Sequence, residues 1–140
     1  MSITEHLSDV SLNYFALLRK LSSKFDLTLS QSLLLIYVPF EGITISDLSD
    51  KLGVDISTMT RNIQRIEKQG LIERSKNLDD KRSIKLHLSK RGKKIIALLN
   101  DDIANNLSPI LKKYDFEKIE KIKSSLESLG WDLYLFRKDL

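Results

Sequence analysis

The sequence predicts a mainly α-helical chain with one small β-wing, arranged as a winged helix-turn-helix core between longer helices at both ends. Apolar residues recur every three or four positions over most of the 140 residues, and two short helical segments are separated by a glycine-containing turn. After these segments, at residues 84–88, apolar and polar side chains alternate with a period of two. With 41% hydrophobic and 30% charged residues, the chain can bury a core.

The first two expected helices are recognised by their apolar spacing. A helix is expected at about residues 5–24, on a stripe formed by Leu7, Val10, Tyr14, Leu17, Leu18, Leu21 and Phe25. A second helix, capped by Thr28 or Ser30, is expected to run through Val38, where Pro39 stops it. This helix is apolar nearly all round, which places it in the interior.

The helix-turn-helix and the wing follow in order. Thr44 or Ser46 can cap a third helix that Gly53 ends, and a fourth helix then runs to Gln69. Its expected inner face consists of Met59, Ile63 and Ile66. Two short helices joined by such a turn form a helix-turn-helix. Strands at 71–75 and 84–88, with a polar tip at 76–82, would form a hairpin, which in this position is a wing.

Two further helices complete the chain. Ser89 can cap a long helix whose stripe is Ile95, Ile96, Leu99, Ile103 and Leu107. Pro109 either kinks this helix or marks its end. The stripe of the last helix is Phe116, Ile119, Ile122, Leu126 and Leu129, and Gly130 ends or bends it.

The outer helices carry more apolar surface than a compact helix-turn-helix lobe can cover. Such stripes either fold back on the core of a monomer or find a partner in a second copy of the chain. We favour a homodimer. The expected organisation is an N-terminal dimerisation helix at 1–28, a winged helix-turn-helix lobe at 29–92 and C-terminal dimerisation helices at 93–140.

Positive charge is concentrated in the middle of the chain. The net charge is +4, but residues 61–94 alone carry 12 Lys and Arg against 4 Asp and Glu. The rest of the chain is therefore net acidic. A basic segment between acidic ends is typical of a module that binds a polyanion, although a solvated helix surface would also be charged.

The outer face of the fourth expected helix carries side chains that can hydrogen-bond to bases or phosphates. Arg binds guanine bidentately, whereas Asn and Gln suit adenine. The free amides of the helix N-terminus would also favour a phosphate. This pattern predicts insertion into the major groove of double-stranded DNA. The residues are Ser57, Thr58, Arg61, Asn62, Gln64, Arg65 and Lys68.

The tip of the expected wing supplies a second set of contacts. Arg82, with Lys76 and Lys81 nearby, can reach the adjacent minor groove, whose negative potential attracts arginine. Asp80 would be repelled by phosphate. We therefore expect Asp80 to support the wing by holding Arg82 or the turn backbone.

Several other classes of function are not expected. The chain has no cysteine, only two histidines, no glycine-rich phosphate loop and no spacing typical of a metal site, so we expect neither an enzyme nor a bound cofactor or metal. The longest apolar run, residues 33–39, is far shorter than the ~20 residues that span a bilayer. No membrane association and a cytoplasmic location are the expectation.

The order and spacing of several motifs resemble the MarR family of regulators. These motifs are Leu27-Thr28-x-x-Gln31, Leu48-x-x-Lys51-Leu52-Gly53, Ile66-Glu67-x-x-Gly70-Leu71-Ile72-x-Arg74, Asp80-x-Arg82 and Leu88-Ser89-x-x-Gly92. The resemblance is close over about residues 25–94. It implies a two-fold dimer built from the terminal helices, groove contacts by Ser57, Thr58 and Arg61, and a wing contact by Arg82.

The resemblance also implies release of the DNA by a small ligand, often aromatic or anionic, or by an oxidant. The thiol-oxidation branch of the family needs a cysteine, which this chain lacks. For a small-molecule effector, candidate lining residues are Tyr14, Arg19, Tyr37 and Phe40. Aromatic residues at helical spacing more often belong to a core.

The sequence as a whole predicts a transcriptional regulator, and specifically a repressor that binds a pseudopalindromic operator as a homodimer. Two alternatives remain at this stage: a winged helix used for protein–protein interaction, and a weakly specific architectural DNA-binding module. The first would favour an acidic or apolar recognition face, and the second a face richer in lysine.

Overall fold

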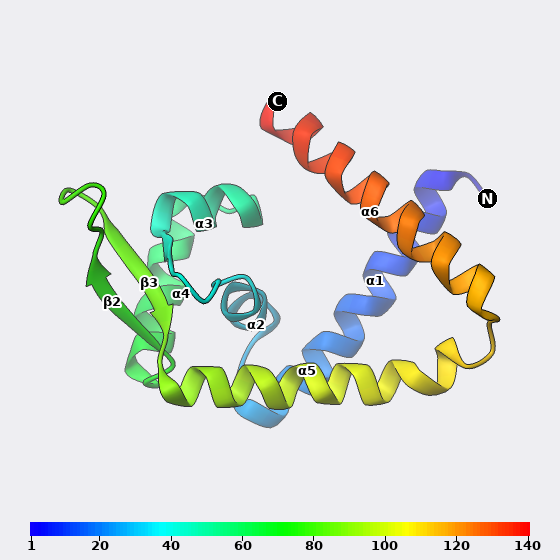
Figure 1. The fold of residues 1–140 in the computed structure, drawn as a ribbon, viewed down its shortest axis with the longest axis horizontal. Helices are drawn as coiled ribbons and strands as arrows, with labels where there is room; N and C mark the ends of the chain where they lie inside the picture. Colours follow the sequence, from blue (N-terminus) through cyan, green and yellow to red (C-terminus); the bar gives the residue numbers. More distant parts are fainter. The chain divides into compact units, whose positions relative to one another are not determined.

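The computed structural model describes all 140 residues, which form two compact units, residues 1–103 and 104–140. Figure 1 shows the elements, which are α1 (Ile3–Ser22), the short 3-10 helix η1 (Ser23–Phe25), α2 (Leu29–Ile36), β1 (Ile43–Thr44), α3 (Ile45–Leu52), α4 (Ile56–Lys68), β2 (Ile72–Lys76), β3 (Ile84–Leu88), α5 (Lys90–Leu111) and α6 (Phe116–Lys138). The predicted fold class, mainly α with a small wing, is confirmed. No helix is long and apolar enough to cross a membrane.

Side-chain caps fix where the helices of the first unit begin. The Thr28 hydroxyl accepts a hydrogen bond from the Gln31 amide (3.2 Å), and the Gln31 side chain accepts one from the Thr28 amide (3.0 Å). This reciprocal pair makes Thr28, rather than Ser30, the cap of α2. Thr44 caps α3 by accepting from the Asp47 amide at 3.1 Å. Helix α2 ends at Ile36, two residues before the end that we expected.

The core of the first unit is apolar and draws on every element from α1 to α5. Its completely or almost completely buried members include Leu18, Leu34, Leu35, Leu48, Met59, Ile63, Ile66, Leu71, Leu86 and Leu99. The inner face predicted for α4 is thus buried, as is the middle of α2. Because Leu18 belongs to this core, the end of α1 is part of the winged-helix lobe as well as a candidate for dimerisation.

The sheet has three strands in the order β1-β3-β2, and both pairs are antiparallel. Strands β2 and β3 form the expected wing hairpin, with Ile72 opposite Leu88 and Lys76 opposite Ile84. Strand β1 was not predicted, because two residues cannot show a period. It pairs Ile43 with Leu86 and so ties the segment before α3 to the inner strand of the wing.

The motif Leu88-Ser89-x-x-Gly92 forms a tight joint between the wing and α5. The Ser89 hydroxyl donates to the Gly70 carbonyl (2.6 Å) and accepts from the Gly92 amide (3.0 Å), as predicted for a cap of α5. The Ser89 amide donates to the Leu71 carbonyl at 2.9 Å. Gly92 faces that same carbonyl group so closely that a Cβ atom there would overlap its oxygen.

The second unit contains the end of α5 and all of α6. Pro109 lies inside α5, which ends two residues later at Leu111. Asp115 caps α6 by accepting from the Lys118 amide at 2.8 Å, and α6 continues past Gly130 instead of ending there. No residue of α6 is buried, although its side chains include Leu126, Trp131 and Phe136, which are 57%, 60% and 64% exposed.

Candidate nucleic-acid interface

Helix α4 begins at a carboxylate that accepts three hydrogen bonds. Asp55 receives them from the Ser57 hydroxyl (2.6 Å), the Thr58 amide (2.8 Å) and the Thr58 hydroxyl (2.9 Å). The expectation that free amides would draw a phosphate to this helix end is therefore wrong for the Thr58 amide, which is already bonded. The negative charge of Asp55 also opposes a phosphate at this position.

Replacing Asp55 by asparagine is expected to flatten the loss of stability in acid. The Ser57 hydroxyl, then the amide and hydroxyl of Thr58, lower the pKa of Asp55 from 3.8 to about 2. Because folding lowers this pKa, the ionised Asp55 carboxylate stabilises the folded state fully above about pH 4. This stabilisation disappears as the pH falls through about 2. Urea unfolding at three pH values in this window measures the effect. Equal pH slopes for the parent and for Asp55→Asn would contradict it.

The polar face predicted for α4 is divided between solvent and the lobe. Ser57, Arg61, Gln64, Arg65 and Lys68 are exposed, and Arg61 forms no hydrogen bond or ion pair within the chain. Thr58 and Asn62 are only half-exposed. The structure thus brings five of the seven predicted residues together on one open face, whereas the other two turn toward α2.

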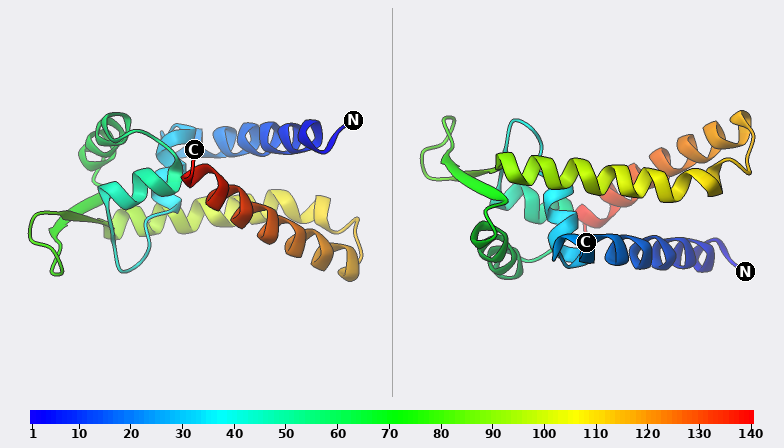
Figure 2. Two further views of the ribbon diagram at one scale, coloured as in Figure 1. Left: turned by 90° about the horizontal axis from the view of Figure 1, so that it is seen from above. Right: turned by 90° about the horizontal axis from the view of Figure 1, so that it is seen from below.

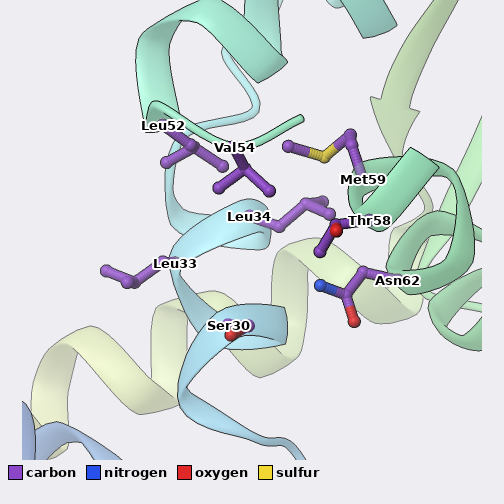
Figure 3. Close-up of a pocket in the computed structure, with 8 residues that line it drawn as sticks. All are labelled: Ser30, Leu33, Leu34, Leu52, Val54, Thr58, Met59 and Asn62. Carbon is purple, nitrogen blue, oxygen red and sulfur yellow. The ribbon is translucent and has the colours of Figure 1, made fainter. Parts of the chain in front are cut away.

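Thr58 and Asn62 line a cavity of about 90 Å³ between α4 and α2 (Figure 3). Met59 joins them from α4, Ser30, Leu33 and Leu34 come from α2, and Leu52 and Val54 come from the end of α3 and the turn after it. The cavity wall is mostly apolar. A ligand that entered this cavity would contact α4 on the side that faces α2, away from its exposed polar face.

A bidentate ion pair joins α4 to the wing. Arg74 of β2 donates from Nε and Nη2 to the two carboxylate oxygens of Glu67, at 2.9 and 2.8 Å. The hydrogen bonds from Arg74 to Glu67 raise the pKa of the Arg74 guanidinium. Both side chains are about two-thirds buried. The negative charge of Glu67 therefore does not weaken the basic face of α4, because Arg74 of β2 neutralises it.

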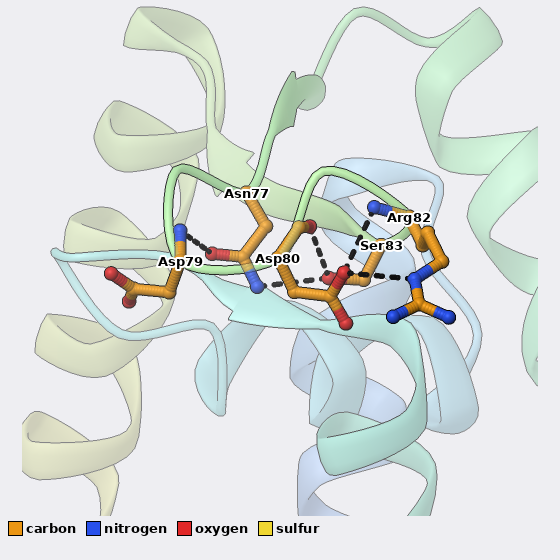
Figure 4. A network of polar contacts seen from close by, with 5 residues as sticks. All are labelled: Asn77, Asp79, Asp80, Arg82 and Ser83. Atoms are coloured by element: carbon orange, nitrogen blue, oxygen red, sulfur yellow. Dashed lines mark hydrogen bonds and ion pairs between the residues drawn. The ribbon is translucent and has the colours of Figure 1, made fainter.

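The tip of the wing is held by hydrogen bonds among its own residues (Figure 4). Asn77 donates to the Ser83 hydroxyl (2.8 Å), which in turn donates to the Asp80 carbonyl (3.1 Å). The Asp80 carboxylate accepts from the Arg82 amide at 3.0 Å and lies 3.7 Å from the Arg82 Nε. Asp80 thus contacts both the turn backbone and, more loosely, the guanidinium.

Arg82 extends away from the wing into solvent. Its side chain is 97% exposed, and Lys76 and Lys81 are exposed as well. Figure 2 shows the loop between β2 and β3 reaching beyond the helices of the lobe. All three cations that were predicted for the wing are therefore exposed: Lys76 ends β2, and Lys81 and Arg82 lie on the loop that Asn77, Asp80 and Ser83 hold in shape.

Of the four residues suggested for an effector pocket, Tyr14 and Tyr37 lie near each other, whereas Phe40 lines a cleft that includes neither of them. The Nζ atom of Lys51 lies 5.2 Å from the centre of the Tyr37 ring. Burial raises the pKa of the Tyr14 hydroxyl, and the nearby Tyr37 raises it further. Phe40 lines a cleft of about 190 Å³ with Pro39, His87, Leu88 and Lys93. Arg19 is exposed. The residues that line the cavity behind α4 include none of these four.

The sequence and the fold have recognisable counterparts. The model of the MarR family matches residues 27–84. The organic hydroperoxide resistance transcriptional regulator of Bacillus subtilis (strain 168) is 32% identical over 114 residues, covering 79% of this chain and 75% of that protein. Among solved structures, apo MarR from E. coli superposes with a TM-score of 0.78 at 23% identity, covering 92% of this chain and 96% of that one. The S. aureus MepR–DNA complex superposes with a TM-score of 0.77 at 19% identity, covering 95% and 99%.

Proposed function

Because the chain belongs to the MarR family, we propose that it is a repressor of transcription that reads a pseudopalindromic operator in double-stranded DNA as a homodimer. The observation that carries the proposal is the open face of α4, where polar and basic side chains project beside a stiffened wing tipped by Arg82. A helix and a wing of this kind can contact the major groove and the neighbouring minor groove together.

The exposed apolar side chains support the homodimer. Helix α6 leaves Leu126, Leu133 and Phe136 at 57%, 45% and 64% exposure on one stripe, and α1 exposes Val10 at 60%. A continuous apolar stripe is rarely left exposed on a monomeric protein. Two copies joined through these helices would present two reading helices to half-sites about one helical turn, roughly 34 Å, apart.

Control by a small ligand is the finer part of the proposal. Its support is the apolar cavity behind α4, where Thr58 and Asn62 belong to the same helix as the exposed Arg61. A ligand that enlarged this space would shift α4 against α2. Such a shift would lower the affinity for the operator without blocking its surface.

Fluorescence anisotropy against a selected pool of duplexes, at two salt concentrations, tests the DNA-binding proposal. Tight, salt-sensitive binding to a two-fold-symmetric site is the expected result. Weak binding without sequence preference would instead indicate an architectural module. No binding at low salt would indicate a winged helix used for protein–protein interaction.

Replacing Arg61 by alanine should weaken operator binding by about 1–3 kcal/mol and relax the preference at one position in each half-site. The guanidinium is exposed and interacts with the Asp55 carboxylate through its charge but by no hydrogen bond, so its removal should leave the fold intact. Lys68→Ala is the contrasting variant, because loss of a phosphate contact should weaken all sequences alike and reduce the salt slope. Binding of every duplex by Arg61→Ala at parental affinity would rule out the assigned reading face.

A further inference from the structure

The exposed Ser57 hydroxyl has its only proton committed. A serine hydroxyl carries one donor and two acceptor lone pairs. The Ser57 proton is donated to Asp55 at 2.6 Å, a short bond to a charged acceptor. Ser57 therefore presents only lone pairs to solvent, and to anything that docks on this end of α4.

The other groups at this helix end do not restore a side-chain donor. The Thr58 hydroxyl also donates to the Asp55 carboxylate, at 2.9 Å, and Thr58 is half-buried against the cavity behind α4. The next side chain on the same helical face is Arg61, one turn later, which consists of donors only. The face thus changes from acceptor to donor within one turn.

We propose that Asp55 is a positioning residue that makes Ser57 select an exocyclic amino group in the major groove, the N6 amino group of adenine or the N4 amino group of cytosine. In that groove guanine offers acceptors at N7 and O6, and thymine offers an acceptor at O4, so only adenine and cytosine present an amino donor. Phosphate oxygens are also acceptors, so the Ser57 hydroxyl has no proton to donate to them. This inference rests on the proposed operator binding and goes beyond it.

The test uses base analogues that lack only the amino group. In the operator selected by the parent protein, single adenines are replaced by purine and single cytosines by 2-pyrimidinone, and affinity is measured by anisotropy. We expect the parent to lose about three- to tenfold at one position in each half-site, the worth of one hydrogen bond. Whether the sensitive position holds adenine or cytosine identifies the base that is read.

The variants separate positioning from charge. Glycine is tolerated at a helix N-cap and carries no carboxylate, so in Asp55→Gly the Ser57 proton is freed and the analogue effect should fall below about twofold. Ser57→Ala should lose it as well. Asp47→Asn removes an equal charge from the first turn of α3 and should keep the parental analogue effect. Thermal unfolding of each variant checks that its fold is retained.

Each outcome decides a separate point. No analogue effect in the parent, or the full effect in Asp55→Gly, would overturn the positioning role while leaving operator binding intact. An analogue effect lost equally in Asp55→Gly and Asp47→Asn would assign it to charge and overturn the inference. A parent protein that selects no sequence would overturn the proposed function, and the inference with it.

Discussion

Replacing Gly92 by alanine is expected to lower the free energy of unfolding by about 3 kcal/mol, because the new methyl group would collide with a backbone atom. The Cβ would overlap the Leu71 carbonyl oxygen, whose carbon lies 3.0 Å away. That carbonyl cannot retreat freely, since it accepts the Ser89 amide at 2.9 Å. Thermal unfolding should show the melting temperature falling by roughly 10 °C.

Gly130→Ala is the matched control, and the expected change has the opposite sign. Gly130 lies within α6, and a Cβ there would meet no atom within 4 Å. Alanine favours a helix over glycine by up to about 1 kcal/mol, so this variant should be slightly more stable than the parent. If the two variants were equally stable, close packing of Gly92 on Leu71 would not be the reason for a glycine in the joint.

The double variant Leu126→Glu, Leu133→Glu is expected to convert the proposed homodimer into a monomer. The two leucines lie seven residues apart on one stripe of α6 and are 57% and 45% exposed. Two carboxylates in an apolar interface would have to lose their hydration without a partner. Because a monomer engages only one half-site, affinity for the full operator should fall by about a hundredfold or more.

Light scattering and operator anisotropy on the same samples measure the two effects. Ser124→Glu, Ser128→Glu is the control pair, since it adds the same charge to exposed positions of α6 outside that stripe. This control should remain a dimer with parental affinity. A leucine-to-glutamate variant that stayed dimeric would place the interface elsewhere, and a monomer with parental affinity would refute binding to two half-sites.

The sequence was sufficient for every α-helix and for the two wing strands, because each of these elements carries its own local signal. The inner face of α4 follows from Met59, Ile63 and Ile66 at helical spacing, and the inner wing strand follows from strict alternation at 84–88. Ser89 could be identified as a cap from its position alone, and its bond to the Gly92 amide agrees. Strand β1 gave no such signal, since it exists only through pairing with β3.

The candidate site was less predictable, because the positions of its side chains depend on contacts between pairs of residues. Asp55 precedes Ile56, the first residue of α4, so the rules for helix caps could have identified it as the cap. Those rules do not predict that its carboxylate also accepts hydrogen bonds from the hydroxyls of Ser57 and Thr58. The pairing of Glu67 with Arg74 needed the turn between α4 and β2 to be known. Thr58 and Asn62 looked equivalent to Arg61 until the packing of α2 showed which of them face inward.

The continuity of α5 has a mechanical consequence. Within the first unit, its residues 90–103 run unbroken from the Ser89 joint, a rod roughly 21 Å long. A tilt of about 10° at one end of such a rod displaces the other by about 4 Å, close to one base-pair step of about 3.4 Å. A small tilt of this segment would thus be amplified, in the proposed complex, into a shift of the wing by about one base-pair step along the operator. Spin-label distances between the wings of a dimer would register that amplification directly.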